Sequence, residues 1–503
     1  MRRLPTALLL ALATPLFAAP AAAQECAFPA SATPAEAAAR TYLDRIAALD
    51  DAGPELNAVI AVNAQAPCEA ARAAQERRPL AGRTVLVKDN IETRELPTTA
   101  GSLALAGNST GRDAPLVAYL REAGGVVLGK ANLSEWANIR STRSTSGWSA
   151  VGGQTRNPHA IDRNPCGSSS GSAAAVAAGL AWAAIGTETD GSISCPASTN
   201  GVVGFKPTLG LVSRTHVVPI SHSQDTAGPI AASVPDAALL LRAIAGSDPA
   251  DPPTAQADRR LVDYTAGLAN ASLEGVRIGV LVGQVGDQPG VTALFEAARA
   301  DLVAAGAILV DVSYDFPDPM WDDEYTVLLF ELRENLGAYL ASSPADIPVR
   351  SLAEVIAFNR AHAAEEMRWF GQEIFELAER TTESESYRDA RANSLFLAGA
   401  DGIDRLLEEH DVQFLIAPTS GPAWTTDPVN GDHFAGSIGA GSLAAIAGYP
   451  HLSVPMGAVE GLPVGLSIMG AKWADHAVLK AGAAYERARS SPLPSPDFQR
   501  WSP

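Results

Sequence analysis

Two polar segments of the sequence carry residue types that could serve as a general base and an oxyanion hole. Lys88 ends the apolar run 84–87 and begins a polar turn. A lysine withdrawn from water loses its proton more readily, so its amine can act as a base. Taken alone, Lys88 would more simply be interpreted as a solvated side chain or an ion-pair partner of Asp89.

The second segment, 186–196, is rich in Gly, Ser and Thr, which predicts a turn. Four of its residues could aim main-chain N–H groups at one point beside a hydroxyl: Thr189, Asp190, Gly191 and Ser192. N–H donors arranged in this way stabilise a developing oxyanion. The presence of this turn is what makes Lys88 a candidate base.

A third segment, 167–171, contains the G-x-S-x-G pattern of a nucleophile elbow, centred on Ser169. Such an elbow requires a buried strand directly before it. Residues 156–165 contain two prolines and several charges, so they cannot form a central strand. The segment leads instead into the small-residue run 173–178, which predicts a helix whose N-terminus presents N–H groups.

The run 124–130 resembles a phosphate-binding loop, G-x-x-x-x-G-K, but this interpretation fails on two counts. Ala131 stands where a Ser or Thr would hold magnesium. Residues 126–128 are themselves strand-like, whereas the loop must follow a strand and begin a helix. We therefore interpret Lys130 as a structural residue.

Short apolar runs alternate with helical patterns along most of the chain, which predicts an α/β fold around a largely buried sheet. A capping box at 33–36, with proline at the first helical position, predicts an N-terminal helix. Helices are also expected at 116–122 and 291–305. The expected strands are 84–87, 126–128, 277–282, 308–312, 412–416, 452–455 and 464–468. Residues 247–253 are the best linker candidate, although the runs on both sides could belong to one sheet.

Composition excludes some classes of partner. The chain has 503 residues and a formal net charge of −19, without a block of like charge. This acidity argues against nucleic acid or an anionic membrane surface as partner. No segment is long and apolar enough to span a membrane permanently.

The N-terminus has the pattern of a secretory signal peptide over residues 1–23. Arg2 and Arg3 precede the apolar run 8–17, and Ala21 to Ala23 provide small residues for cleavage before Gln24. We therefore expect an exported protein, periplasmic or secreted. The two arginines do not suffice to distinguish twin-arginine export from ordinary secretion.

Several motifs together resemble the amidase signature family of serine hydrolases. They are N-P-C-G-S-S-S-G-S-A-A-A at 164–175, G-T-E-T-D-G-S-I at 186–193 and V-K-D-N at 87–90. Similar landmarks occur at 129–136, 201–208, 225–229, 417–418 and 461–465. Within the family, segments 134–138, 153–158 and 166–172 most resemble bacterial peptide amidases, which remove ammonia from peptide C-terminal amides.

The resemblance implies one large α/β domain over residues 24–503, with a mixed, twisted, open sheet flanked by helices on both faces. Its parts would be an N-terminal helical segment at 33–78, a catalytic core at 80–235 and a C-terminal part of the same sheet at 275–490. The resemblance implies neither a cofactor nor a metal ion.

By the same resemblance, Lys88 would be the base, Ser168 a bridging serine after a cis peptide bond, and Ser192 the nucleophile. The oxyanion and substrate-binding residues would be Thr189, Asp190, Gly191 and Ser169. Cys166 and Ser170 replace glycines of many relatives, and both are small enough to leave catalysis intact. The acyl-binding pocket would be lined by residues near Trp136, by the 143–149 loop and by the 315–400 region.

The function implied is amide hydrolysis through an acyl-enzyme, with release of ammonia from peptide C-terminal amides. One alternative is a broad aliphatic or aryl acylamidase or esterase of the same family. Others are an esterase pairing Ser169 with a histidine, of which His222 is nearest to a motif, and a non-catalytic exported binding protein. A role in tRNA-linked amidotransfer conflicts with the signal peptide.

The four cysteines are too few for a disulfide framework in a chain of this length. Cys26 and Cys68 flank the N-terminal helical segment and could pair. Cys166 and Cys195 would lie beside the bridging serine and the nucleophile. We expect these two to be reduced packing residues, although an oxidising compartment would permit a mutual disulfide.

Overall fold

The computed structural model describes residues 33–434 and 436–502. The leader predicted at residues 1–23 lies outside the described residues. Cys26, one partner of the pair considered with Cys68, also lies outside them. Among the helices that the structure describes, none has the length and apolarity needed to cross a membrane.

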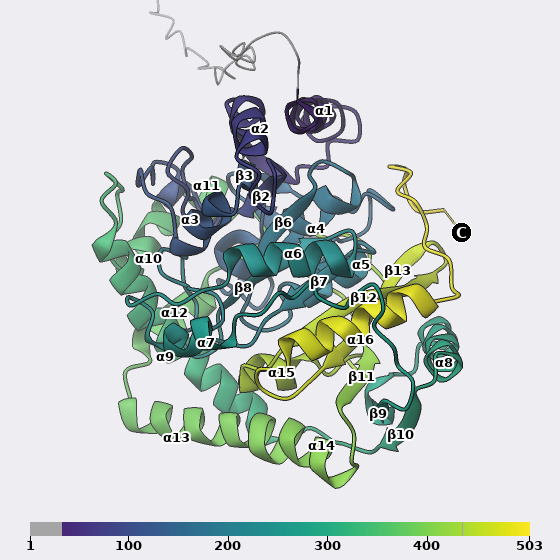
Figure 1. Cartoon of the computed structure of the whole chain (residues 1–503). Coiled ribbons are helices and arrows are strands. Elements are labelled where there is room, and N and C mark those ends of the chain that lie inside the picture. The colour runs from purple at the N-terminus through teal and green to yellow at the C-terminus, as the bar shows by residue number, and fades with distance from the viewer. Residues whose placement is uncertain (1–32, 435, 503) are drawn as a thin grey trace, which may run out of the picture.

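Within the described residues, one mixed sheet of eleven strands runs through the molecule in the order β1-β3-β2-β6-β8-β7-β12-β13-β11-β9-β10 (Figure 1). Its strands are β1 Val59–Val62, β2 Thr84–Lys88, β3 Val126–Ala131, β6 Ala183–Glu188, β7 Val203–Lys206, β8 Thr226–Ala231, β9 Arg277–Leu281, β10 Ile308–Val312, β11 Phe414–Pro418, β12 His451–Val459 and β13 Leu462–Met469. β4 (Trp148–Ser149) and β5 (Gly153–Gln154) form a separate ribbon. The predicted single α/β domain with a mixed open sheet is confirmed.

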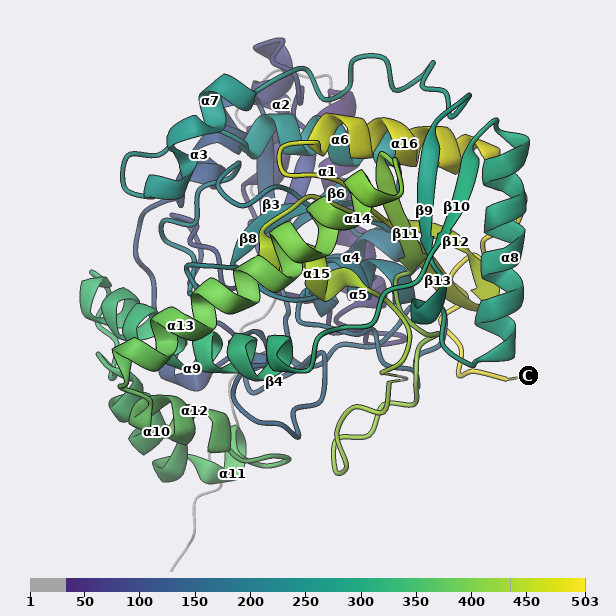
Figure 2. The same ribbon diagram turned by 90° about the horizontal axis from the view of Figure 1, so that it is seen from below.

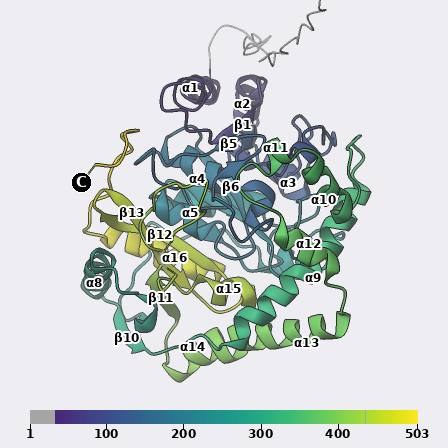
Figure 3. The same ribbon diagram turned by 180° about the vertical axis from the view of Figure 1, so that it is seen from behind.

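Helices cover both faces of this sheet. The α-helices are α1 Pro34–Leu49, α2 Ala66–Gln75, α3 Pro115–Glu122, α4 Ser170–Ala177, α5 Ser194–Thr199, α6 Val234–Ile244, α7 Ala257–Arg260, α8 Pro289–Ala304, α9 Pro319–Ser342, α10 Leu352–Ala361, α11 Ala363–Glu366, α12 Glu373–Arg380, α13 Ser384–Leu395, α14 Arg405–Glu409, α15 Gly441–Ala447 and α16 Asp475–Ala488. Apolar side chains of α3, α6, α8 and α16 share one core with the sheet, and those of α1, α2, α4 and α5 share another. Figure 1 has α6 and α16 in front of the strands, and Figure 3 presents α4 and α5 from behind.

A further group of helices, α9 to α13, lies to one side of the sheet (Figure 2). α9, α10 and α12 share an apolar cluster with Trp136 and Leu105, and α13 packs along α9. These helices belong to the 315–400 region, so they extend the domain beside the ends of the central strands instead of adding strands to the sheet.

Local sequence accounts for the start of α1 and of α4. Thr33 caps α1 by accepting a hydrogen bond from the Glu36 amide at 3.1 Å, which confirms the predicted helix start and its N-cap. α4 begins in the Gly/Ser-rich segment and packs tightly on β1 and β3. A Cβ on Gly171 would collide with the Ala58 carbonyl oxygen, so only glycine fits there.

Every strand predicted from an apolar run is present, with ends shifted by a few residues. Four strands of the sheet were not predicted. β6, β7 and β8 contain Ala, Gly, Thr or Pro residues that interrupt the apolar pattern, whereas β1 is a short apolar run, Val-Ile-Ala-Val, that was missed. The linker candidate at 247–253 is a loop ending in a short 3-10 helix, and strands on both sides belong to the one sheet.

Lys130 lies inside strand β3, as expected once the phosphate-loop interpretation was rejected. Its ammonium pairs with the Asp89 carboxylate at 3.1 Å, and both side chains are fully buried. It also donates to the Ile91 carbonyl and the Thr98 hydroxyl, each at 2.7 Å. This lysine therefore joins β3 to the loop that follows β2, and its charge is neutralised.

Candidate active site

The site forms where β2 and β6, parallel neighbours in the sheet, end at the same edge. Lys88 is the last residue of β2, and Thr187 and Glu188 are the last two residues of β6. Ser168 stands just before α4, which packs on β2 and β6. The topology therefore brings Lys88 next to two segments that lie 80 and 99 residues further along the chain.

Lys88 is fully buried and its Nζ contacts three oxygen atoms. It lies 2.7 Å from Ser168 Oγ, 2.9 Å from Thr187 Oγ1 and 3.2 Å from the Thr187 carbonyl oxygen. The carbonyl can only accept, and Thr187 Oγ1 also accepts from the Asn90 amide at 3.0 Å. A neutral amine can donate two protons to Thr187 and keep its lone pair for the Ser168 O–H.

Burial lowers the pKa of Lys88 to about 7. The negative charges of Asp225 and Glu188 act in the other direction and raise the pKa, but burial has the larger effect. Desolvation disfavours the ammonium, while nearby carboxylates favour it. Near neutral pH a substantial fraction of Lys88 is therefore the free amine, as a general base requires.

Ser168 is also fully buried, and the peptide bond from Gly167 to Ser168 is cis, as the resemblance predicted. Its carbonyl oxygen accepts from the Ser134 amide at 3.0 Å. A Cβ on Gly167 would collide with the Ser134 hydroxyl. The loop after β3 thus supports the back of the Ser168 segment.

Ser192 lies in the turn between β6 and α5, which is held at both ends. The Glu188 carboxylate accepts from the Ile193 and Ser194 amides at 2.7 and 2.9 Å. At the other end, the Thr189 hydroxyl donates to Asp225 at 2.6 Å. Gly191 has a φ of +79°, which favours glycine. The Ser192 carbonyl accepts from the Ser169 amide at 3.1 Å, so the two serine segments lie side by side.

Asp190, Gly191 and Ser192 line a cavity of about 730 Å³. Among the hydrogen bonds of the described residues, none is donated by the main-chain N–H groups of these three residues. Amides that are fixed in a turn, open to a cavity and unbonded within the protein can bind a ligand oxygen. Ser192 is half-buried at this surface, whereas Lys88 and Ser168 lie behind it.

Ser169 occupies a different place from the one expected. It is fully buried, donates to the Thr187 carbonyl at 3.1 Å and accepts from the Thr187 amide at 3.2 Å. With its hydroxyl engaged on both sides, Ser169 joins α4 to β6 and does not line the cavity. His222 is exposed beside Asn335 and Glu331, so the geometry offers Ser169 no histidine there.

The expected pocket lining is found in part. Ala137 to Ile139 line the cavity, but Trp136 itself packs against Phe375 at a ring distance of 5.7 Å. Ser146 of the 143–149 loop lines the cavity, and so do three residues of the 315–400 region, Phe316, Trp321 and Leu328. Segment 419–442 forms much of the remaining wall, and no pattern in the sequence indicated this.

Two acidic residues near the site, Asp225 and Glu324, were not among the expected site residues. Asp225 precedes β8 and accepts from the Ile220 and Ser221 amides at 2.8 and 2.9 Å. Burial raises the pKa of Asp190 to about 6, while hydrogen bonds from Ser442 and Glu324 oppose that rise. The family landmark at 225–229 includes Asp225, but the sequence did not indicate that its carboxylate holds the turn that carries Ser192. Nothing in the sequence connects Glu324 to Asp190.

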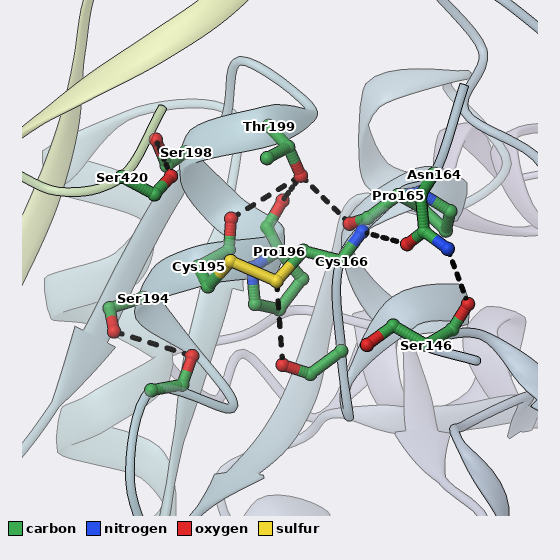
Figure 4. The surroundings of a disulfide bond; sticks show 12 residues. Ser146, Asn164, Pro165, Cys166, Ser194, Cys195, Pro196, Ser198, Thr199 and Ser420 are labelled. Carbon is green, nitrogen blue, oxygen red and sulfur yellow. Dashed lines mark hydrogen bonds between the residues drawn. A yellow bond between two sulfur atoms is a disulfide. The ribbon is translucent and has the colours of Figure 1, made fainter. Parts of the chain in front are cut away.

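Cys166 and Cys195 form a disulfide, so the expectation of reduced packing residues was wrong (Figure 4). The bond ties the segment before Ser168 to helix α5, which begins two residues after Ser192. Thr199 adds to this connection by donating to the Pro165 carbonyl at 2.8 Å. Both cysteines line the cavity. In the part of the chain described here, no group of acidic, histidine or cysteine residues could hold a metal ion.

Comparison with known proteins gives consistent results. A family model described as amidase matches residues 37–479. The X-ray structure of native peptide amidase from Stenotrophomonas maltophilia matches with a TM-score of 0.87 and 49% identity, over 92% of this chain and 95% of that one. A probable amidase of Arabidopsis thaliana is 38% identical over 89% of this chain and 85% of its own. A glutamyl-tRNA(Gln) amidotransferase subunit of Salinispora arenicola is 37% identical over 89% of this chain and 93% of its own.

The disulfide provides a test of how the two serine segments are held together. The Cys166→Ala/Cys195→Ala double variant should be less stable than the oxidised protein by about 3 kcal/mol, because the cross-link restricts the unfolded chain. Urea denaturation followed by tryptophan fluorescence measures the difference. Each single variant should lose as much as the double variant, since either one breaks the bond. A double variant as stable as the oxidised protein would show that the bond does not stabilise the fold.

Proposed function

The chain belongs to the amidase family and hydrolyses amide C–N bonds, and we propose that it does so at the C-terminal amides of peptides, releasing ammonia. The observation that carries this proposal is the contact between buried Lys88 and Ser168, in a segment that is hydrogen-bonded to Ser192 through the Ser169 amide. The identity to a peptide amidase over nearly the whole chain, higher than that to the amidotransferase subunit, supports the substrate class.

In the proposed mechanism Ser192 attacks the carboxamide carbon. A serine hydroxyl is a weak nucleophile until a base removes its proton. Ser168 accepts that proton on its Oγ while its own proton passes to the free amine of Lys88, which lies 2.7 Å away. The C–O bond to Ser192 forms as the carbonyl electrons move onto oxygen.

The new oxyanion would accept hydrogen bonds from main-chain N–H groups of the turn 189–192. These donors are held in place before the substrate arrives, by Glu188 at one end and Asp225 at the other. Donors that need not reorganise stabilise the transition state more than mobile ones. Lys88 then returns its proton through Ser168 to the departing nitrogen, which leaves as ammonia. Water hydrolyses the acyl-enzyme by the same route.

The charge of the cavity supports an amide in preference to a free carboxylate terminus. Asp190 and Asp432 line it, and its lining within the described residues includes no lysine, arginine or histidine. A carboxylate ligand would therefore find no cation to pair with and would be repelled. An uncharged C-terminal amide avoids this repulsion, and the carboxylate product would be released readily.

We also propose that the protein is exported. The leader pattern at residues 1–23 supports this, and so does the Cys166–Cys195 disulfide, because such bonds persist in oxidising compartments.

Hydrolysis of peptide amides is tested by measuring ammonia release from C-terminally amidated peptides, simple aliphatic and aromatic amides, anilides and esters side by side. We expect the peptide amides to have the highest kcat/KM. Ser192→Ala and Lys88→Ala should each lower it by at least ~1000-fold with the fold intact, because nucleophile and base act as a unit.

Ser437→Ala is the matched serine control, since Ser437 is exposed and does not line the cavity. Higher rates on anilides or esters would favour the broader acylamidase or esterase alternative. Turnover that survives in Ser192→Ala would overturn the catalytic assignment, and no turnover of any amide would favour a binding protein.

The proposed base predicts the pH dependence. Because the pKa of Lys88 is about 7 and the free amine is the active form, kcat/KM should rise about tenfold per unit below pH 7 and level off above it. Steady-state rates on one uncharged peptide amide between pH 5 and 9 give the profile. A rate already maximal at pH 5 would exclude Lys88 as the base.

Export predicts that the mature protein begins at Gln24. Intact-mass measurement of the protein recovered from outside the cytoplasm of an expression host should give the mass of residues 24–503. Leu9→Arg, which interrupts the apolar run of the leader, should leave the protein in the cytoplasm with residues 1–23 attached. A native chain that keeps its N-terminus would refute export by this leader.

A further inference from the structure

The outer part of the cavity differs in exposure from its inner part. Trp321 is 42% exposed and Phe434 is 64% exposed, and both line the cavity. Deeper lining residues such as Ile220, Trp424 and Ile438 are less than a tenth exposed. The rim therefore carries two large aromatic side chains that remain in contact with water, even though each has a neighbouring ring.

Trp321 lies on α9, a helix that is connected by hydrogen bonds of Gln224 to the turn that carries Ser192. Trp321, Glu324 and Leu328 follow one another at helical spacing on α9, so they share one face. Trp321 and Leu328 line the cavity. Glu324 accepts from the Gln224 amide at 2.8 Å, and the same amide lies 3.4 Å from the Thr189 carbonyl. α9 thus places Trp321 about one helical turn from the residue that anchors it to the turn carrying Ser192.

Phe434 is anchored on the other wall. Its ring lies 5.7 Å from that of Trp424, whose indole N–H donates to Asp432 at 3.3 Å. Asp432 also accepts from the Ser146 amide at 3.0 Å, which joins this segment to the loop before the disulfide. On the α9 side, Phe316 packs against Trp321 at 5.2 Å. The two exposed aromatics thus rest on separate supports.

We propose that Trp321 and Phe434 form a second subsite, which binds an apolar side chain of the peptide upstream of the amidated residue. This inference rests on the proposed function, which places the reacting carbonyl at the Ser192 turn and sends the rest of the peptide outward past the rim. Covering exposed aromatic surface is favourable, and the flat rings accept aliphatic or aromatic side chains. Since the described residues that line the cavity include no basic side chain, an acidic residue at the same position would gain nothing from it.

The test compares amidated acetyl-tetrapeptides of glycine and alanine with versions carrying one leucine at each upstream position in turn. In the wild type, leucine at one position should raise kcat/KM at least about fivefold, mainly through KM. Trp321→Ala and Phe434→Ala should each remove most of that gain. Both variants should slow hydrolysis of a short acetyl-amino-acid amide much less than that of the leucine peptide, because the short amide does not reach the rim.

Matched controls are Val429→Ala and Phe396→Ala, which remove side chains that are 66% and 54% exposed and do not line the cavity. Both control variants should hydrolyse every substrate with the kcat/KM of the wild type. The proposal is overturned if leucine brings no gain in the wild type, or if the rim variants slow the short amide as much as the leucine peptide.

If no peptide amide is hydrolysed, the proposed function fails, and binding then decides the subsite separately. Calorimetric titration of the leucine and parent peptides into Ser192→Ala should give tighter binding of the leucine peptide. Adding Trp321→Ala should abolish the difference. Equal affinities in Ser192→Ala would reject the subsite itself.

Discussion

The burial of Lys88 without a carboxylate in direct contact is the constraint on which the site depends. The chain buries three of its five lysines, each in a different way. Lys130 is neutralised by Asp89 at 3.1 Å, and Lys206 donates to the Tyr449 carbonyl at 2.6 Å. Lys88 alone of the three contacts a serine hydroxyl. Removing an ammonium from water without an ion-pair partner favours loss of its proton, so the same burial that costs stability produces a base.

Strand order explains how the fold maintains this arrangement. β6 lies between β2 and β8 in the sheet. β2 and β6 are parallel and end at one edge, while antiparallel β8 begins there. Lys88, Glu188 and Asp225 are therefore neighbours because of topology, not because of sequence proximity. α4 then brings Ser168 over the same edge through its packing on β2 and β6.

Except for the edge strand β1, the strands on either side of this sheet were predicted from the sequence better than the three at its centre, β6, β8 and β7. Apolar runs identified β9, β10 and β13, which are rich in Val, Ile and Leu. β6 reads Ala-Ala-Ile-Gly-Thr-Glu and showed no such signal, although it carries Thr187 and Glu188. Its small residues are needed where α4 packs closely, since a Cβ on Gly186 would lie 2.8 Å from the Ser169 hydroxyl. A strand that carries two residues of the site thus has a composition that gives little strand signal.

Residue identities at the site were predictable where a motif fixes a local turn, and not where the contact crosses segments. The turn 189–192 and the cis bond before Ser168 lie within short motifs. The buried position of Ser169, its bonds to Thr187 and the Cys166–Cys195 bond depend on how α4, α5 and β6 meet in space. Trp136 shows the same limit, because it faces Phe375 in a helical layer that is separated from it by more than two hundred residues of sequence.

Glu188 and Asp225 determine both the shape of the turn that carries Ser192 and the electrostatic environment of Lys88. Both carboxylates raise the pKa of Lys88, and both also fix the turn that carries Ser192. The amides and hydroxyls that they accept from disperse their charge, which limits how far they favour the ammonium of Lys88. A change at either residue would alter the base and the turn at once. The side chains of Trp321 and Phe434 contact neither Lys88 nor these two carboxylates in the described structure, because α9 and segment 419–442 carry them outside β2 and β6. Substrate preference can therefore change at the rim while the base, bridging serine and nucleophile stay as they are.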